Sequence, residues 1–308
     1  KLDREGSSVV EISENSSHVL TFNATDEDHD SSKPDLVYVV DGKEVRYHNH
    51  TEQDDDPYGS LQNGTSLHDP YPNDSGAKLV KVADFNRDGL DDILELNSTN
   101  LIRVFLNSGN MQFDGPVIVP NSSVSISQVL VDDLSGDGYP DVAALDPDTG
   151  KIFAWSWDNS DPSSPLFLPL IEGGVSNELF TGGAQLKAIK LSDINSDGLI
   201  DVVALADGQS RILWIENKGG SEFESALEIL PHSDYDLPIH DFDIGDLDGD
   251  GDEDIILATD ANVFFIENSG SDQFESMVSL YNDSNGNPFR LKIGDLNGDS
   301  RNDIIVSV

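Results

Sequence analysis

The chain has 308 residues, enough for one large all-β domain or for two domains of ordinary size. Its 59 acidic and 17 basic residues give a net charge of −42, which argues against binding to nucleic acid or to anionic membrane surfaces. Cysteine is absent, which excludes disulfides and thiol chemistry, and no apolar run approaches the roughly 18 residues that a membrane-spanning helix needs. The first four residues, KLDR, do not form a signal peptide, so we expect a mature chain or a fragment.

The N-terminal part of the chain places strand patterns around an acidic stretch. Residues 19–24 precede the acidic stretch 26–35, and apolar runs follow at 36–40 and 44–48. This order predicts an irregular copy of a strand–acidic loop–strand repeat that recurs later in the chain. The ATDED sequence at 24–28 resembles the calcium motif of the cadherin family. The alternative is therefore a separate cadherin-like sandwich over residues 1–75, with the repeats described below over 76–308.

Five copies of one nine-residue acidic pattern follow. They cover residues 84–92, 133–141, 193–201, 246–254 and 295–303, and their first residues lie 49 to 60 residues apart. We call them the first to fifth acidic loops and number their residues as positions one to nine. A spacing near fifty residues is typical of an array of one repeated supersecondary unit.

Strand patterns flank every acidic loop. Before each loop apolar residues alternate with polar ones, as at Val80 and Val82, which predicts a strand with one buried face. After each loop comes a short continuous apolar run, as at 142–145, which predicts a strand buried on both faces. Three repeats then share a third strand and an Asn-x-Gly turn, with the asparagine at Asn107, Asn217 and Asn268.

Each unit is therefore predicted to be a four-stranded antiparallel sheet with the acidic loop between its first two strands. A single sheet of this size cannot bury both of its faces, whereas radial stacking of several sheets hides their edges and shares a core. The predicted fold is an all-β β-propeller of six or seven four-stranded blades over residues 18–308.

The acidic loops have the chemistry of a cation site. Positions one, three, five and nine carry side-chain oxygens, position seven can add a backbone carbonyl, and glycine at position six allows a left-handed turn around an ion. Calcium takes six to eight oxygen ligands, whereas magnesium demands stricter octahedral geometry and retains its waters. We therefore expect about five calcium ions, and a sixth if residues 26–35 also bind one. The predicted ligands are Asp84, Asn86, Asp88, Leu90, Asp92, Asp133, Ser135, Asp137, Tyr139, Asp141, Asp193, Asn195, Asp197, Leu199, Asp201, Asp246, Asp248, Asp250, Asp252, Asp254, Asp295, Asn297, Asp299, Arg301 and Asp303.

The pattern D-x-[DN]-x-D-G-x-x-D between strands resembles the FG-GAP/VCBS repeats of integrin-α-type β-propellers. The resemblance covers residues 80–308, and more loosely residues 18–49. It implies a calcium-binding propeller whose ligands occupy the positions given above. The chain departs from the pattern at Ser135 in position three and at Ser300 in position six, and the FG and GAP tripeptides themselves are missing.

Sequons point to a secreted protein. Glycosylation of Asn-x-Ser/Thr requires a secretory route and an exposed loop, so we predict an extracellular location. The candidate glycosylation sites are Asn15, Asn23, Asn49, Asn63, Asn73, Asn97, Asn121 and Asn282.

Motifs of catalysis are missing from the sequence. It contains no G-x-S-x-G, H-E-x-x-H or phosphate-binding loop. Trp155, Trp157 and Trp214 could line a sugar site, but aromatic residues on third strands more often pack between blades. We predict a calcium-stabilised, non-catalytic adhesion, binding or structural module with a protein or glycan ligand. A lectin or a polysaccharide-active enzyme is the alternative class.

The two ends of the chain suggest a second hypothesis. The fifth acidic loop is followed by one strand pattern that ends at Val308, and residues 9–13 (VVEIS) form a spare strand pattern within the segment 1–17. That strand would either close its own ring or complete the last blade of a neighbouring copy. Head-to-tail strand exchange builds open polymers, so the hypothesis is a subunit of an extracellular filament or surface layer.

Overall fold

β-Strands are the regular elements of the described part of the chain, as the apolar patterns predict. The computed structural model describes residues 19–25, 35–40, 44–48, 65–66, 76–109, 112–121, 125–171, 178–181, 185–206, 211–229, 238–260, 262–270, 273–282, 290–296, 299 and 301–307. Among these residues there is no helix of the length and hydrophobicity that crossing a membrane requires.

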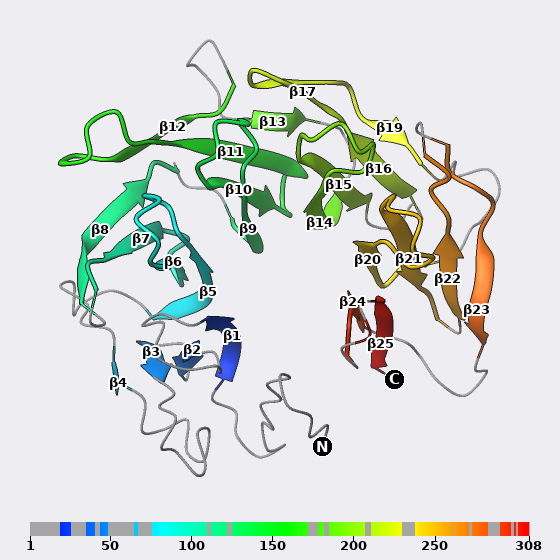
Figure 1. The fold of residues 1–308 in the computed structure, drawn as a ribbon, viewed down its shortest axis with the longest axis horizontal. Helices are drawn as coiled ribbons and strands as arrows, with labels where there is room; N and C mark the ends of the chain where they lie inside the picture. The colour runs from blue at the N-terminus through cyan, green and yellow to red at the C-terminus, as the bar shows by residue number, and fades with distance from the viewer. Residues whose placement is uncertain are drawn as a thin grey trace. The chain divides into compact units, whose positions relative to one another are not determined.

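Four-stranded antiparallel sheets, with their strands in chain order, are the repeating unit (Figure 1). We name each sheet by its first strand. The β1 sheet contains β1 (Val19–Thr25), β2 (Asp35–Val40), β3 (Glu44–His48) and β4 (Thr65–Ser66). The β5 sheet contains β5 (Ala77–Ala83), β6 (Asp92–Asn97), β7 (Ile102–Asn107) and β8 (Phe113–Val119).

Three further sheets repeat this arrangement with small additions. The β9 sheet contains β9 (Gln128–Asp132), β10 (Asp141–Asp146), β11 (Lys151–Asp158) and β12 (Leu166–Pro169), and β13 (Glu178–Thr181) also pairs with β11. The β14 sheet contains β14 (Leu186–Ser192), β15 (Asp201–Ala206), β16 (Arg211–Ile215) and β19 (Leu227–Glu228), while β17 (Asn217–Gly219) and β18 (Glu222–Phe223) form a separate hairpin. The β20 sheet contains β20 (Asp241–Gly245), β21 (Asp254–Ala258), β22 (Asn262–Ile266) and β23 (Val278–Asn282).

The β24 sheet differs from the others. Within the described residues it consists of two strands, β24 (Arg290–Gly294) and β25 (Asp303–Ser307). In this sheet, as in the four sheets before it, the acidic loop connects the first strand to the second. The predicted place of all five acidic loops is confirmed.

The contacts between Cα atoms divide the chain into two units. One consists of residues 1–125, 139–142 and 155–169, and the other of residues 126–138, 143–154 and 170–308. In the first unit, Val45 of β3 joins Val80 and Phe105 of the β5 sheet in one buried cluster, so the β1 and β5 sheets share a core. The predicted strand at residues 9–13 and the acidic stretch 26–34 lie outside the described residues.

Burial in the second unit explains why second strands are continuously apolar. Along β15, Val202 and Ala204 belong to one buried cluster, whereas Val203 and Leu205 belong to another on the opposite face. β6, β10, β15 and β21 are buried at every residue, as predicted. On the first strand β5, Val80 is fully buried and Val82 is half-buried against the same cluster, so the two residues share one inward face as predicted.

Candidate metal centres

Each acidic loop turns back on the carboxylate at position one. In the first loop, Asp84 Oδ1 accepts a hydrogen bond from the backbone N–H of Asp88 (3.1 Å), and Asp84 Oδ2 accepts one from Gly89 N–H (2.9 Å). The bond from position six recurs at Gly138, Gly198 and Gly251. These glycines have φ values of +88° to +97°, so the predicted left-handed turn at position six is confirmed for the first four loops.

Position four also adopts a left-handed conformation, and the sequence pattern did not reveal this. The residue is Gly136 in the second loop and Gly249 in the fourth, but Arg87 in the first and Ser196 in the third, with φ values of +59° and +58°. A left-handed residue with a side chain is uncommon. The loop framework therefore imposes this backbone conformation even where glycine is missing.

The aspartate at position nine is a buried connector between strands. Asp92 is fully buried, and its Oδ2 accepts a hydrogen bond from Phe85 N–H (2.9 Å), while Oδ1 accepts one from Asn107 N–H at the end of β7 (2.8 Å). The same pair of bonds occurs at Asp201 and at Asp254. Each of these carboxylates thus fastens its loop to the last residue of the third strand or to the backbone two residues after it.

The fourth loop brings three carboxylates together. One oxygen from each of Asp246, Asp248 and Asp254 lies within 4.8 Å of the others. None of these three side chains takes part in an ion pair of the described residues. Two carboxylates about 5 Å apart repel by roughly 3 kcal/mol at an effective dielectric constant near 20. Because a carboxylate oxygen can accept an N–H bond and still bind a cation, this all-oxygen cluster fits calcium.

Other predicted ligands among the described residues are held in the same framework. Asn86 Nδ2 donates to Asp88 Oδ2 (3.0 Å), and Asn195 Nδ2 donates to Asp197 Oδ2 (3.1 Å), so positions three and five touch in both loops. The position-five carboxylate accepts the N–H of position seven at Leu90, Leu199, Asp252 and Arg301. In the fifth loop Asp295, Asp299, Arg301 and Asp303 are described, whereas Asn297 is outside the described residues.

Burial changes the acidity of the position-nine carboxyl groups. It raises the pKa of Asp92 to about 7 and that of Asp201 to about 6, although hydrogen bonds from backbone N–H groups oppose the shift. Burial also raises the pKa of Asp254. A bound cation would favour the ionised form of each group.

Asparagine side chains two residues after the third strands β16 and β22 join neighbouring loops. Asn217 Nδ2 donates to the carbonyl of Leu134 in the second loop (2.8 Å), and Asn268 Nδ2 donates to the carbonyl of Ile194 in the third loop (2.7 Å). The prediction from the Asn-x-Gly pattern was a tight turn. The turn is present, because Asn217 Oδ1 accepts Gly219 N–H, but the connection to the preceding loop was missed. The signal was the recurrence of asparagine 14 to 16 residues after position nine at Asn107, Asn217 and Asn268.

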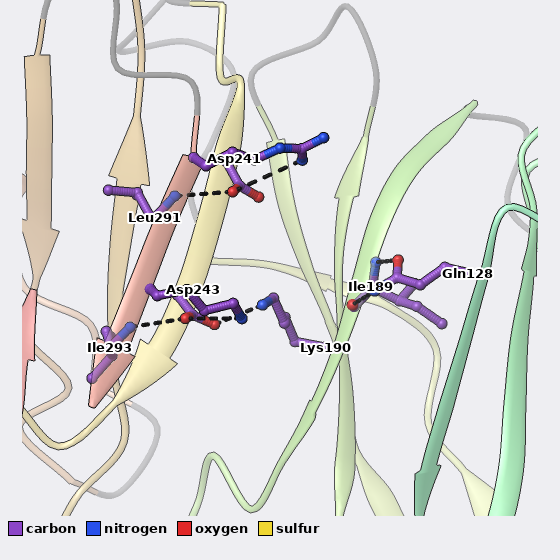
Figure 2. A network of polar contacts seen from close by, with 9 residues as sticks. Gln128, Ile189, Lys190, Asp241, Asp243, Leu291 and Ile293 are labelled. Carbon is purple, nitrogen blue, oxygen red and sulfur yellow. Dashed lines mark hydrogen bonds and ion pairs between the residues drawn. The ribbon is translucent and has the colours of Figure 1, made fainter. Parts of the chain in front are cut away.

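First strands are joined by side chains that bond to a neighbouring backbone (Figure 2). Gln128 accepts Ile189 N–H (2.9 Å) and donates to the Ile189 carbonyl (2.7 Å), as a paired strand would. Asp243 accepts bonds from Lys190 Nζ (2.7 Å) and from Ile293 N–H (3.0 Å). These residues connect β9 to β14, and β20 to both β14 and β24, and no sequence motif indicated them.

The three tryptophans pack inside the protein. Trp155, Trp157 and Trp214 are 1%, 2% and 3% exposed, so none of them offers a surface for a sugar ring. In the first unit, Trp157 contacts both Phe85 of the first acidic loop and Phe167 of β12, with ring centroids 5.6 and 5.0 Å apart. The interpretation as interior aromatics is confirmed.

The candidate glycosylation sites differ in exposure. Asn97 is fully buried, and its Oδ1 accepts hydrogen bonds from Thr99 and Leu101. Because a glycan requires an exposed asparagine nitrogen, Asn97 is unsuited to glycosylation in this fold. Asn121 is half-buried, Asn282 is exposed, and Asn23 lies in β1. Asn15, Asn49, Asn63 and Asn73 lie outside the described residues, and glycosylation at all seven stays a prediction.

Solved structures share this fold. An Agrocybe aegerita lectin that recognises non-reducing terminal N-acetylglucosamine is 19% identical, with 92% of this chain and 73% of the lectin covered and a TM-score of 0.63. BBS1N, solved in complex with ARL6DN, is 12% identical over 94% of this chain and 75% of its own, with a TM-score of 0.57. The BP39L lectin of Burkholderia pseudomallei is 12% identical over 84% of this chain and 69% of its own, with a TM-score of 0.56. At these identities the likeness concerns the fold alone, and it confirms an all-β fold of four-stranded, propeller-type blades.

The repeats identify the family. The FG-GAP-like repeat family matches residues 84–144, 193–256 and 246–306, which is more than half of the chain. The chain therefore belongs to the FG-GAP-like repeat family, as the acidic loops predicted. No curated protein sequence matches the chain significantly.

Proposed function

We propose that this protein is a secreted, calcium-stabilised propeller that serves as a non-catalytic binding module. The observation that carries the proposal is the convergence of Asp246, Asp248 and Asp254 in a loop whose framework recurs along the chain. Oxygen ligands at this spacing suit a hard cation of variable coordination, which calcium is.

Calcium at these loops would strengthen each sheet as a unit. The loop joins the first two strands, and the position-nine aspartate bonds to the end of the third strand, as Asp254 does with Asn268. An ion at the loop neutralises the clustered carboxylates and so holds three strands together. At about 1 mM calcium and a dissociation constant of about 0.1–1 mM, each site adds roughly 0.4–1.4 kcal/mol to the free energy of unfolding. Five sites would add about 2–7 kcal/mol, comparable to the stability of a whole domain.

The partner is best sought among proteins and glycans, with a protein favoured. The structural relatives include two lectins and BBS1N, which was solved in complex with ARL6DN. Those partners are properties of the relatives, and they motivate the proposal for this chain. Burial of Trp155, Trp157 and Trp214 removes the sugar platform that the sequence offered, which favours a protein surface as ligand.

An extracellular location follows from the same proposal. Sites that bind calcium in the range of 0.1–1 mM are typical of extracellular modules, and exposure of Asn282, the first residue of a sequon, is compatible with secretion. The alternative of a filament joined by residues 9–13 draws no support from the described residues. The sequence lacks the catalytic motifs named above, which favours a non-catalytic module over the enzyme alternative.

Calorimetry of the calcium-loaded and calcium-depleted protein tests the proposal. We expect 2 mM calcium to raise the melting temperature by about 5–15 °C, because 1 kcal/mol corresponds to roughly 2 °C for a chain of this size. Magnesium at the same concentration should give a much smaller rise. Asp248→Asn should reduce the calcium-dependent rise, whereas Asp260→Asn, an exposed aspartate outside the loops, should leave it unchanged. Equal melting temperatures with and without calcium would refute the proposal.

A further inference from the structure

The third and fourth acidic loops contact each other through side chains. Ser196, at position four of the third loop, donates its hydroxyl hydrogen to Asp252 Oδ1, at position seven of the fourth loop (3.0 Å). Both loops belong to the second unit, and their sheets share one buried cluster that includes Val203 of β15 and Phe242 of β20. The two candidate calcium sites are therefore neighbours in one packed structure.

The contact between position seven and position four of the preceding loop recurs with different chemistry. In the first unit, the guanidinium carbon of Arg87, at position four of the first loop, lies 5.0 Å from the ring centre of Tyr139, at position seven of the second loop. In the second unit, a Cβ atom on Gly136, at position four of the second loop, would lie 3.4 Å from Leu199, at position seven of the third loop. A cation over an aromatic ring and a leucine over a glycine are both complementary pairs. The residue at position seven therefore matches the one at position four of the loop before it.

A second, buried connection joins the third and fourth loops. Asp254 Oδ1, at position nine of the fourth loop, accepts Asn268 N–H (2.9 Å), and Asn268 Nδ2 donates to the Ile194 carbonyl in the third loop (2.7 Å). Ile194 N–H in turn donates to Asp201 Oδ2, at position nine of the third loop (3.3 Å). All four residues are at most 1% exposed. Three hydrogen bonds thus connect a predicted calcium ligand of one loop to a predicted ligand of the other.

These connections make the order of one loop affect the other. Without an ion, the carboxylates of Asp246, Asp248 and Asp254 repel one another, which lowers the cost of opening the fourth loop. Opening that loop would carry Asp252 away from Ser196. An ion in the fourth loop keeps these groups in place, so an ion that enters the third loop has less disorder to remove.

Repulsion between the two ions acts in the opposite direction. It is weakened by solvent and salt, because Asp197 and Asp250, at position five of the two loops, are exposed, and the Debye length at physiological ionic strength is about 8 Å. The buried hydrogen bonds through Asn268 are not screened in this way. We therefore expect the contacts between the loops to outweigh the repulsion.

We propose that Ser196 and Asn268 couple the third and fourth calcium sites, so that an ion in one loop raises the calcium affinity of the other. Ser196 acts through Asp252 and Asn268 acts through Ile194, so both are positioning residues and not ligands. The inference rests on the proposed calcium binding and extends it from independent sites to a coupled pair. Coupling between two binding sites is reciprocal and typically amounts to a factor of roughly 5 to 150 in affinity.

Backbone NMR follows the two loops separately. The N–H groups of Gly198 and Gly251 donate to the position-one carboxylates Asp193 and Asp246 (2.8 and 3.1 Å), so their chemical shifts report calcium at the third and fourth loops. The full chain, deuterated and isotope-labelled, is titrated with calcium at physiological ionic strength. We expect the two signals to change at one shared midpoint, with a Hill coefficient above one.

A ligand substitution in one loop tests the effect on the other. Asp250→Asn removes the position-five carboxylate of the fourth loop and should raise the calcium concentration at the Gly198 midpoint about fivefold, although the third loop itself is unchanged. Asp88→Asn is the matched control, because it makes the same change at position five of the first loop, which belongs to the other unit. It should alter the Gly198 midpoint by less than about twofold.

Variants of the two coupling residues separate coupling from folding. Ser196→Ala removes the hydroxyl group alone, whereas Ser196→Gly also relieves the left-handed backbone, whose φ is +58°. Both should reduce the effect of Asp250→Asn on the Gly198 midpoint to about half, although they change stability in opposite directions. Asn268→Ala should reduce that effect at least as much, with retention of the fold at saturating calcium checked by circular dichroism.

Three outcomes would overturn the inference. An unchanged or lower Gly198 midpoint in the Asp250→Asn protein would show that the sites are independent or antagonistic. Equal shifts in the Asp250→Asn and Asp88→Asn proteins would assign the effect to overall charge. An undiminished effect in the Ser196 or the Asn268 variants would show that the residue does not carry the coupling. Failure of the proposed function is distinguishable, because then neither the loop signals nor the melting temperature would respond to calcium.

Discussion

The β20 and β24 sheets start from the same sequence pattern and end in different environments. Both have an alternating first strand, an acidic loop and an apolar second strand, and both second strands pair antiparallel with the first. β21 then receives β22 and β23 and is fully buried, whereas β25 has no third strand among the described residues and stays half-exposed. The repeat sequence alone therefore forms the first strand, the loop and the second strand, whereas burial of the second strand depends on the neighbouring strands.

The conformation of the loop and of the first strand depends on the sequence of the repeat itself, whereas burial of the second strand depends on other strands. In the fifth loop, as in the fourth, the position-nine aspartate accepts the N–H of position two, at Leu296 and at Leu247. The hydrogen bond to the preceding acidic loop comes from a different place in the two sheets. Asn268 makes it from the end of a third strand, whereas in the β24 sheet Asn302, within the loop itself, donates to the Asp246 carbonyl (2.9 Å).

The sharpest test of this comparison substitutes equivalent isoleucines. Ile256→Asp should destabilise the protein by about 4 kcal/mol or more, because it removes a fully buried side chain and buries a charge. Ile305→Asp should cost no more than about 1 kcal/mol, because Ile305 is exposed and faces Lys292 across the strand pair. Urea denaturation measures both values. Equal costs would mean that β25 is covered in solution.

The two connecting asparagines give a smaller contrast. Asn268→Ala should cost about 2–4 kcal/mol, since it leaves the carbonyls of Ile194 and Glu253 without their buried donor. Asn302→Ala should cost less than about 1 kcal/mol, because water can replace the donor at an exposed site. Both losses are read from urea denaturation in calcium. A larger loss at Asn302 would contradict the view that third-strand asparagines are the main connectors.

The pH dependence of stability provides a third and smaller test, which concerns Asp92 in the β5 sheet and Asp201 in the β14 sheet. The folded-state pKa values of Asp92 and Asp201, about 7 and about 6, lie above the ordinary value, so the folded protein binds protons more tightly than the unfolded chain. Stability is therefore lost as pH rises toward 7. Calcium-depleted protein should be roughly 1–3 kcal/mol more stable at pH 5.5 than at pH 7.5. Saturating calcium should shrink or reverse this difference, and thermal melts in both conditions measure it. Lower stability of the depleted protein at pH 5.5 would contradict the account.

Much of the fold could be predicted because it depends on period and local chemistry. Alternating and continuous apolar runs indicated the first and second strands, and glycine at position six indicated the left-handed turn. The position-nine aspartates were predicted as ligands, but their role as buried connectors to the third strand was not. That role depends on the N–H of Asn107 or Asn217, which comes from 15 or 16 residues farther along the chain.

Contacts between sheets could not be predicted for a physical reason. Gln128 bonds to Ile189, and Asp241 and Asp243 bond to the backbone of β24, across separations of about fifty to sixty residues. A single glutamine or aspartate on a strand looks like a solvated polar residue until its neighbour is known. The sequence indicated an incomplete last blade, because one strand pattern follows the fifth acidic loop. The 44% exposure of Ile305 was not indicated, because the sequence of β25 matches that of the buried second strands.

Calcium in the acidic loops can be located in a crystal structure of the calcium-loaded protein with anomalous scattering recorded for calcium. We expect an anomalous peak in each of the five acidic loops, about 2.3–2.6 Å from the oxygens at positions one, three, five and nine. Well-ordered loops without such peaks at millimolar calcium would contradict this expectation.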